Sequence, residues 1–187
     1  MRQSESITAG PGRLSDPVSI VGIGDIAQAD FGAACYVLDA LARIQFNDAV
    51  QLFYLGGEPR CAAGYLYGTQ LAIIVGVFCF GGKPGTCHHW DYAVFCQHRA
   101  WMAAECPMIQ ALARTISANS LADGFPETLR FIWIEPGLTN GYRVSAPVRK
   151  AIWKTVHTIK KMLVQTALLP DKALSVSSMI IPGAPPW

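Results

Sequence analysis

The stretch Ser19-Ile20-Val21-Gly22-Ile23-Gly24-Asp25 decides the fold of this chain. The apolar residues over 18–22 predict a first strand, and the glycines after it predict a tight turn. Apolar side chains then recur at helical spacing over 30–44, which predicts a helix. A strand that feeds a helix through glycines is typical of an open α/β sheet. Such a sheet places its site at the carboxyl end of the strand.

The rest of the chain continues the alternation of strands and helices. We expect strands over 50–55, 71–80, 86–90 and 129–134, and helices over 60–67, 93–105 and 108–119. The 71–80 run is apolar on both faces, which indicates a strand in the middle of a sheet covered on both sides. The 86–90 strand, with two histidines, is expected at an edge. The fold prediction is a three-layer α/β sandwich, with helices on both faces of a twisted, mostly parallel five-stranded sheet.

The last predicted helix has the clearest signals. Ser145 is the expected N-cap, Pro147 fits the first turn, and Pro170 ends the helix. Its apolar stripe is Val148, Ile152, Val156, Ile159 and Leu163, and its exposed face is Arg149, Lys150, Lys154, Lys160 and Lys161. This amphipathic pattern predicts a helix that packs on the sheet along one side.

The composition of the chain limits the kinds of function that we expect of it. With 187 residues, 51% hydrophobic and 15% charged, the chain suits one globular domain over 18–169, between a polar leader (1–17) and a Pro-rich tail (170–187). A net charge of +2 gives no case for nucleic acid or a membrane as partner. The leader has no apolar core of a signal peptide, so we expect a cytoplasmic protein whose six cysteines are thiols.

The first turn also permits a nucleotide-binding interpretation. Gly22-x-Gly24-x-x-Ala27 is an allowed form of the dinucleotide fingerprint. That fingerprint needs a helix N-terminus at the glycines, to face the pyrophosphate. Asp25 and Asp30 would crowd the phosphates, and no acid for the ribose ends the second strand. A nucleotide-binding α/β domain is therefore the less favoured alternative.

Four stretches in order make the chain resemble the maturation endopeptidases of nickel-iron hydrogenases. The first is 21–26 with Asp30 and, further on, Asp39-Ala40-Leu41. The second is Leu55-Gly56-Gly57, and the third is the 73–77 strand followed by Pro84-Gly85-Thr86. The fourth runs from Pro136 to Ile152. The resemblance implies the sandwich fold and a cytosolic role. Enzymes of this family cut a C-terminal extension from the nickel-loaded large-subunit precursor.

The family resemblance also implies a metal site of two carboxylates and a histidine. Carried over by position, these ligands fall on Phe31, Gly76 and Met108, and the site is therefore predicted to be degenerate. Asp30 could replace the first acid if the alignment shifts by one residue. Hard or borderline divalent ions need oxygen and nitrogen donors, which these side chains barely supply. Nickel is thus implied by resemblance only, and no cofactor or catalytic residue is predicted.

A second cluster offers relocated ligands. Cys87, His88, His89, Asp91, Cys96, His98 and Cys106 fall within twenty residues and are donors that zinc or nickel accepts. Their spacing matches no standard metal motif, and on a strand His88 and His89 point to opposite faces. The alternative, an edge strand followed by an ordinary helix, is favoured.

The functional prediction is a maturation factor that acts by binding. We expect it to be a pseudoenzyme, with the hydrogenase large-subunit precursor as its partner. The predicted contact surface is formed by Gly24, Asp25, Gly56 and Gly57, which lie at strand ends. An active but atypical peptidase with relocated ligands is the alternative.

Overall fold

The computed structural model describes residues 18–44, 46 and 49–165. The predicted leader, the Pro-rich tail and the helix end at Pro170 lie outside these residues. The strands are β1 (Val18–Gly22), β2 (Val50–Tyr54), β3 (Leu71–Val77), β4 (Cys87–Asp91) and β5 (Thr128–Ile134). The α-helices are α1 (Ala33–Ala42), α2 (Ala62–Leu66), α3 (Tyr92–Glu105), α4 (Pro107–Asn119) and α5 (Ala146–Gln165); Ala29–Gly32 and Pro59–Cys61 are 3-10 turns.

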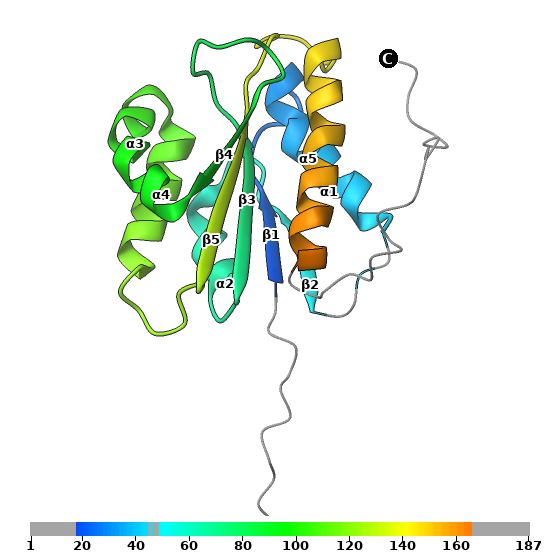
Figure 1. Cartoon of the computed structure of the whole chain (residues 1–187). Coiled ribbons are helices and arrows are strands. Elements are labelled where there is room, and N and C mark those ends of the chain that lie inside the picture. The colour runs from blue at the N-terminus through cyan, green and yellow to red at the C-terminus, as the bar shows by residue number, and fades with distance from the viewer. Residues whose placement is uncertain (1–17, 45, 47–48, 166–187) are drawn as a thin grey trace, which may run out of the picture.

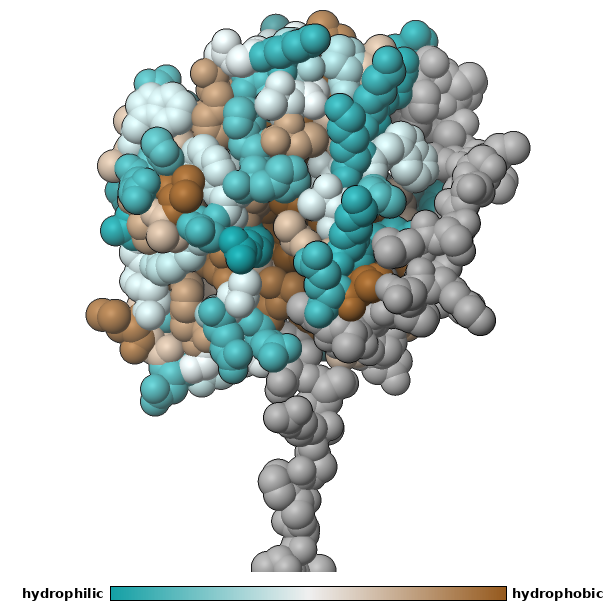
Figure 2. Space-filling view, viewed as in Figure 1, coloured by the Kyte–Doolittle hydropathy of each residue, from teal (hydrophilic) through white to brown (hydrophobic). Residues whose placement is uncertain are grey.

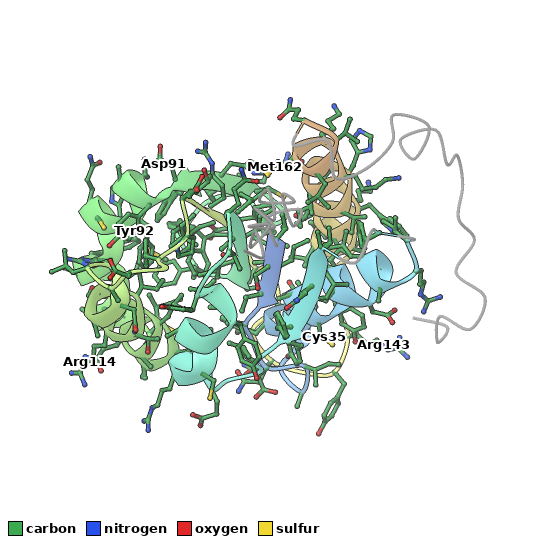
Figure 3. The ribbon with its side chains drawn as sticks, turned by 90° about the horizontal axis from the view of Figure 1, so that it is seen from below. Cys35, Asp91, Tyr92, Arg114, Arg143 and Met162 are labelled. Carbon is green, nitrogen blue, oxygen red and sulfur yellow. The ribbon has the colours of Figure 1, made fainter. Side chains whose placement is uncertain are left out.

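The strands form one sheet in the order β2-β1-β3-β5-β4, and only the edge strand β4 runs antiparallel. The helices α1 and α5 cover one face, and α2, α3 and α4 cover the other (Figure 1, and from below Figure 3). This is the predicted three-layer sandwich. Every residue of β3 is buried, as its unbroken apolar run predicts.

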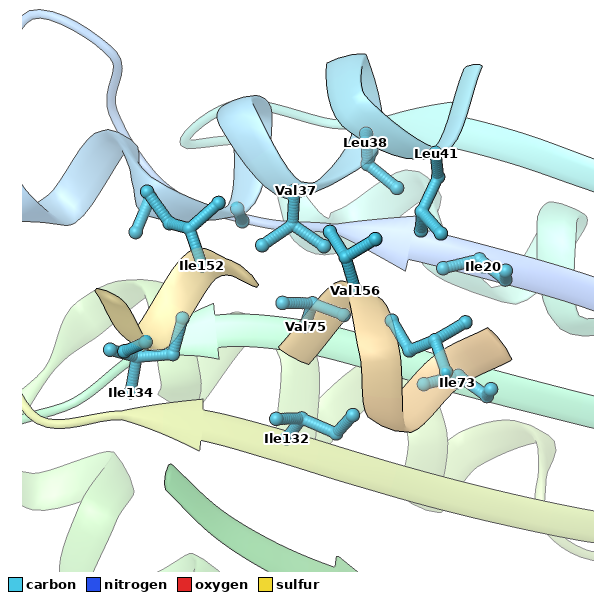
Figure 4. Close-up of a cluster of buried hydrophobic side chains, with 14 of the residues drawn as sticks. Ile20, Val37, Leu38, Leu41, Ile73, Val75, Ile132, Ile134, Ile152 and Val156 are labelled. Atoms are coloured by element: carbon cyan, nitrogen blue, oxygen red, sulfur yellow. The ribbon is translucent and has the colours of Figure 1, made fainter. Parts of the chain in front are cut away.

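The face under α1 and α5 holds one of two core layers. Branched side chains of β1, β3 and β5 meet the apolar stripes of both helices there (Figure 4). The predicted stripe of α5 is buried throughout. Lys160 is the exception to its predicted exposed face, since only 8% of it is exposed.

The predicted 71–80 strand is three residues too long. It ends at Val77, because the backbone amides of Phe80, Gly81 and Gly82 turn onto the carboxylate of Glu135, at 3.0–3.1 Å. Glu135 is only 1% exposed and directly follows β5. A buried carboxylate needs such donors, and it bends the chain away from the sheet.

The helix predicted over 30–44 begins later than its sequence pattern suggests. Residues Ala29–Gly32 form a 3-10 turn, and α1 starts at Ala33. The helix then packs closely on β1: a Cβ added at Gly22 would lie 2.7 Å from Leu38 Cδ1. The first glycine of the fingerprint is therefore explained by helix–strand packing.

Two further observations concern the whole described chain. All six cysteines are free thiols, as predicted. None of the helices in residues 18–165 combines the length and the apolar character that crossing a bilayer requires.

Candidate functional site

The predicted contact surface lies where β1 and β2 end, and the backbone joins its two halves. The amide of Gly24 donates to the carbonyl of Gly56 at 2.9 Å, and the hydroxyl of Tyr54 donates to the carbonyl of Gly24 at 2.7 Å. Asp25 and Gly57 flank this contact on the surface. The four residues predicted from the two glycine turns are thus brought together.

The geometry of a dinucleotide site is not formed at these glycines. Gly24 has φ +146°, and a Cβ there would lie 2.2 Å from the carbonyl oxygen of Phe31, so the position requires glycine for packing. Asp25 turns back on its own loop and accepts hydrogen bonds from Ala27 N and Gln28 Nε2. Because α1 starts only at Ala33, no helix N-terminus faces the turn.

Asp30 is fully buried and holds a distant loop. Its carboxylate accepts hydrogen bonds from the backbone amides of Gly137, Leu138 and Ser145 at 2.6–2.7 Å. The hydroxyl of Ser145, the predicted N-cap of α5, donates to the same carboxylate at 2.8 Å. Four donors use the lone pairs that a metal ion would need. Asp30 therefore serves as a clamp between the chain after β1 and the loop before α5.

The three positions carried over from the family's ligands lie in apolar surroundings. Phe31 packs against the core layer under α1 and α5. Met108, on α4, packs against the opposite layer. Gly76 lies in β3 between them and contributes no side chain. The residues present therefore do not fit a nickel site at these positions, because they supply no oxygen or imidazole donor.

Position 76 is also closed by a neighbouring side chain. Gly76 pairs with Trp133 across β3 and β5, and a Cβ at position 76 would lie 2.6 Å from Trp133 Cζ3 and 3.0 Å from Ile23 Cγ1. Trp133 is fully buried, and its indole N–H has no hydrogen-bond partner among the described residues. The indole occupies the space into which a carboxylate at position 76 would project.

The predicted relocated cluster is spread over both sides of β4. The ring of His88 contacts Phe80 in a tilted arrangement, with centroids 4.4 Å apart, and the ring of His98 contacts Trp90 in the same way at 5.1 Å. His89 points to the other face, toward α5, as strand geometry predicts. Within the described part of the chain, no three Cys, His, Asp or Glu side chains come together as a metal group.

One histidine, His88, does lie near a carboxylate. That carboxylate belongs to Glu135, which was not among the candidates from the sequence. His88 Nε2 lies 3.6 Å from Glu135 Oε2, near the start of β4 and directly after the end of β5. The Glu135 oxygens already accept the amides of the 80–82 loop. An acid directly after the apolar 129–134 run is the signal that could have identified it. The pair supplies two donors where the family's site has three.

Two titratable groups at these surfaces have shifted pKa values. Burial, and to a smaller extent the nearby Cys35, raises the pKa of Tyr54 to about 12. Its hydroxyl therefore stays protonated and keeps donating to Gly24. Desolvation lowers the pKa of His89, and the adjacent His88 lowers it too. His89 is thus neutral at neutral pH.

Comparison with solved structures identifies the architecture. HybD, the hydrogenase maturating endopeptidase from E. coli, is 19% identical over 80% of this chain and 93% of its own, with a TM-score of 0.73. The fold is that of the hydrogenase maturation endopeptidases. Another Escherichia coli endopeptidase, solved in solution, gives 17% identity, 81% and 94% coverage and a TM-score of 0.75.

An archaeal maturation endopeptidase shares the fold as well. The nickel-iron hydrogenase maturation protease HybD from Thermococcus kodakarensis is 20% identical, with coverage of 78% and 98% and a TM-score of 0.61. No protein-family profile and no curated protein sequence matches the chain. The resemblance inferred from the residues is therefore confirmed by the fold, at identities too low for sequence comparison alone.

Proposed function

We propose that this chain is a cytosolic hydrogenase maturation factor that binds a nickel-iron hydrogenase large-subunit precursor without cleaving it. The observation that carries the proposal is the closure of position 76 by Trp133, within a fold that otherwise matches the maturation endopeptidases over most of its length. Phe31 and Met108 offer no metal donor at the other two positions. A maturation endopeptidase that lacks its metal ligands keeps only its ability to bind.

The surface for this binding is the rim formed by Asp25, Ile26, Gly56, Gly57, Leu138 and Tyr142. Backbone bonds from Ala29 N to Gly141 O and from Asp30 N to Leu138 O hold its two loops together. Three of its apolar side chains face solvent: Ile26 is 49% exposed, Leu138 47% and Tyr142 87%. Exposed apolar side chains gathered at strand ends favour a protein partner.

The proposal is tested by mixing the full chain with a nickel-loaded large-subunit precursor that retains its C-terminal extension. We expect saturable binding by calorimetry and an intact precursor by mass spectrometry after prolonged incubation. Removal of the extension would establish the atypical peptidase instead. Saturable micromolar binding of NAD or ATP would support the nucleotide-binding alternative.

A matched pair of variants tests the rim. Ile26→Asp places a charge within it, and Leu121→Asp places the same charge on a loop after α4, where the side chain is 97% exposed. We expect Ile26→Asp to weaken precursor binding about tenfold, as burying an unpaired charge at an interface does, and Leu121→Asp to leave it unchanged. Equal effects of the two substitutions would exclude the rim as the contact surface.

A further inference from the structure

A groove runs along α5 on the side that faces the β4–β5 edge of the sheet. Its upper part is a hollow of about 580 Å³ between the loop before β4 and the middle of α5. This part is lined by Lys83, Thr86, His89, Lys154, His157 and Thr158, among others. The groove exists because α5 and α1 leave the antiparallel edge strand β4 partly uncovered on this face (Figure 1).

The charge on this groove is of one sign. None of the described residues that line it is acidic. Lys83 and Lys154 face it from opposite walls, and in the described part of the chain no carboxylate lies within 4.0 Å of either ammonium group. Two ammonium groups across one hollow, with no carboxylate partner among the described residues, create a positive potential that attracts anionic groups.

The helix that forms one wall concentrates the positive charge of the molecule. Five of the 15 basic residues of the chain lie on α5, which has no acidic residue, so the remaining residues carry 10 basic and 13 acidic side chains. Figure 2 shows hydrophilic side chains along α5 bordering a hydrophobic area between this helix and the β4–β5 edge. The helix α5 therefore forms a basic wall of the groove, while the residues outside α5 carry more acidic than basic side chains.

The lower part of the groove is apolar. A second hollow, of about 260 Å³, is lined by Leu71, Trp90, Arg130, Phe131 and Met162, among others, and His89 borders both hollows. Asp91 lies beside this end, with Oδ2 4.0 Å from Arg130 Nη1, and it also caps α3. The unbalanced positive charge thus lies at the upper end, and the apolar floor at the lower end.

The wall opposite α5 is held in place before any ligand arrives. Thr86 donates to the carbonyl of Lys83 through both its amide and its hydroxyl, at 3.1 and 2.7 Å. Gly85 lies so close to Pro147 that a Cβ would be 2.5 Å from that carbonyl oxygen. Cys87 Sγ lies 3.7 Å from Thr155 Oγ1 on α5. A pre-formed wall lowers the entropy cost of binding.

The dimensions of the groove favour an extended polypeptide as its ligand over a small ion. From Lys154 to Gln165, the α5 wall is about 16 Å long at the helical rise per residue. About five residues of extended polypeptide span this distance. A phosphate or acetate ion would fill one end of the upper hollow and leave the apolar floor empty.

We propose that this groove binds an extended, acidic polypeptide segment, with its carboxylates between Lys83 and Lys154 and an apolar side chain over Met162. None of the described residues that line the groove belongs to the rim at the ends of β1 and β2. The inference is thus independent of the proposed function, and its failure would leave that proposal intact.

The test uses fluorescence anisotropy of a labelled hexapeptide, four glutamates followed by two leucines, with the full chain. The double variant Lys83→Glu/Lys154→Glu reverses the charge inside the groove. The control Lys150→Glu/Lys161→Glu makes the same change of net charge on exposed residues of the same helix that do not line the groove. We expect about tenfold weaker binding for the first variant, and less than about twofold for the second.

A change to the probe tests the apolar floor, and a competing ion tests the basic part of the groove. Replacing the two leucines with serines should weaken binding about fivefold, because the apolar floor loses its partner.

Millimolar inorganic phosphate should displace the peptide only through its ionic strength, to the same extent as sodium chloride at equal ionic strength. Specific displacement by phosphate would overturn the proposal in favour of a small-anion site. Equal weakening by the two double variants would overturn it in favour of non-specific attraction. Tighter binding of a labelled oligouridylate than of the peptide would assign the basic wall to nucleic acid.

Discussion

Position 76 and the α5 groove lie on opposite faces of the same sheet and differ in every respect that matters for binding. At position 76 the indole of Trp133 fills the available space, and no charged side chain lies among the contacts of an added Cβ. Along α5, a hollow of about 580 Å³ is lined by Lys83 and Lys154 among others, and a hollow of about 260 Å³ is lined mainly by apolar side chains. One sheet thus carries a closed, apolar position on one face and a shaped, charged groove on the other.

The largest expected effect concerns the clamp below the rim. Asp30→Asn turns one acceptor oxygen into a donor that faces backbone amides. We expect the free energy of unfolding to fall by about 3 kcal/mol, since hydrogen bonds to a buried charge are lost and a donor is left unsatisfied. Urea unfolding measures this change. Asp25→Asn, on the surface of the same loop, is the control and should cost less than about 1 kcal/mol. A cost for Asp30→Asn no larger than that of its control would show that the rim does not depend on the clamp.

The closure of position 76 is tested by a double-mutant cycle. Gly76→Ala should cost about 2 kcal/mol, because its Cβ overlaps the Trp133 ring. In a Trp133→Leu background the same alanine should cost only about 0.5 kcal/mol, because the contact with Ile23 remains. The resulting coupling, about 1.5 kcal/mol from denaturant unfolding, measures the contact directly. Additive costs would contradict the account of why this position is closed.

A smaller effect is expected at the β2 edge of the sheet, where the hydroxyl of Tyr54 donates to the carbonyl of Gly24. Tyr54→Phe should lower the free energy of unfolding by about 1 kcal/mol. The native pKa of Tyr54, about 12, exceeds the usual value of 10.0, so its contribution is present below pH 10 and is lost as the pH rises through 12. Absorbance at 295 nm during alkaline titration should lose a late-titrating phenol in the variant. An unchanged titration curve would assign that late step to another tyrosine.

The smallest expected effect is the dependence of the protein's stability on pH that arises from His89, a residue that lines the groove. Its pKa is lowered in the folded protein, so protonation favours the unfolded chain. Stability should therefore fall as the pH drops below the ordinary histidine value of 6.5. The loss between pH 7 and pH 5 should be smaller in His89→Gln than in the unmodified protein. A larger loss in the variant would place the imidazole in surroundings that favour its charged form.

The order of strands and helices could be predicted from the sequence, because it depends on local periodicity. The buried run of β3 and the stripe of α5 are patterns that each segment carries by itself. The clamp by Asp30 could not be predicted, since its partners Gly137 and Ser145 lie more than a hundred residues away. The end of β3 could not be predicted either. It depends on hydrogen bonds to Glu135 from loop amides that lie 53–55 residues away in the sequence.

The candidate site shows the same limit. The absence of family ligands at Phe31, Gly76 and Met108 can be read from the residues alone. The closure of position 76 depends on the register between β3 and β5, which pairs Gly76 with Trp133. The groove depends on how α5 packs beside the edge strand β4, whose edge position alone could be predicted. Neither relation follows from a local sequence pattern, because each joins segments that are distant in the sequence.

We propose that the position carried over from the family's metal site is closed and without ligands in this chain. Calorimetric titration of the untagged, full-length protein with nickel tests it most directly, with an active maturation endopeptidase of the same fold as positive control. We expect no stoichiometric binding at micromolar nickel by this chain, and clear binding by the control. Tight binding of one nickel ion per chain, abolished by a substitution at Phe31, Gly76 or Met108, would contradict it.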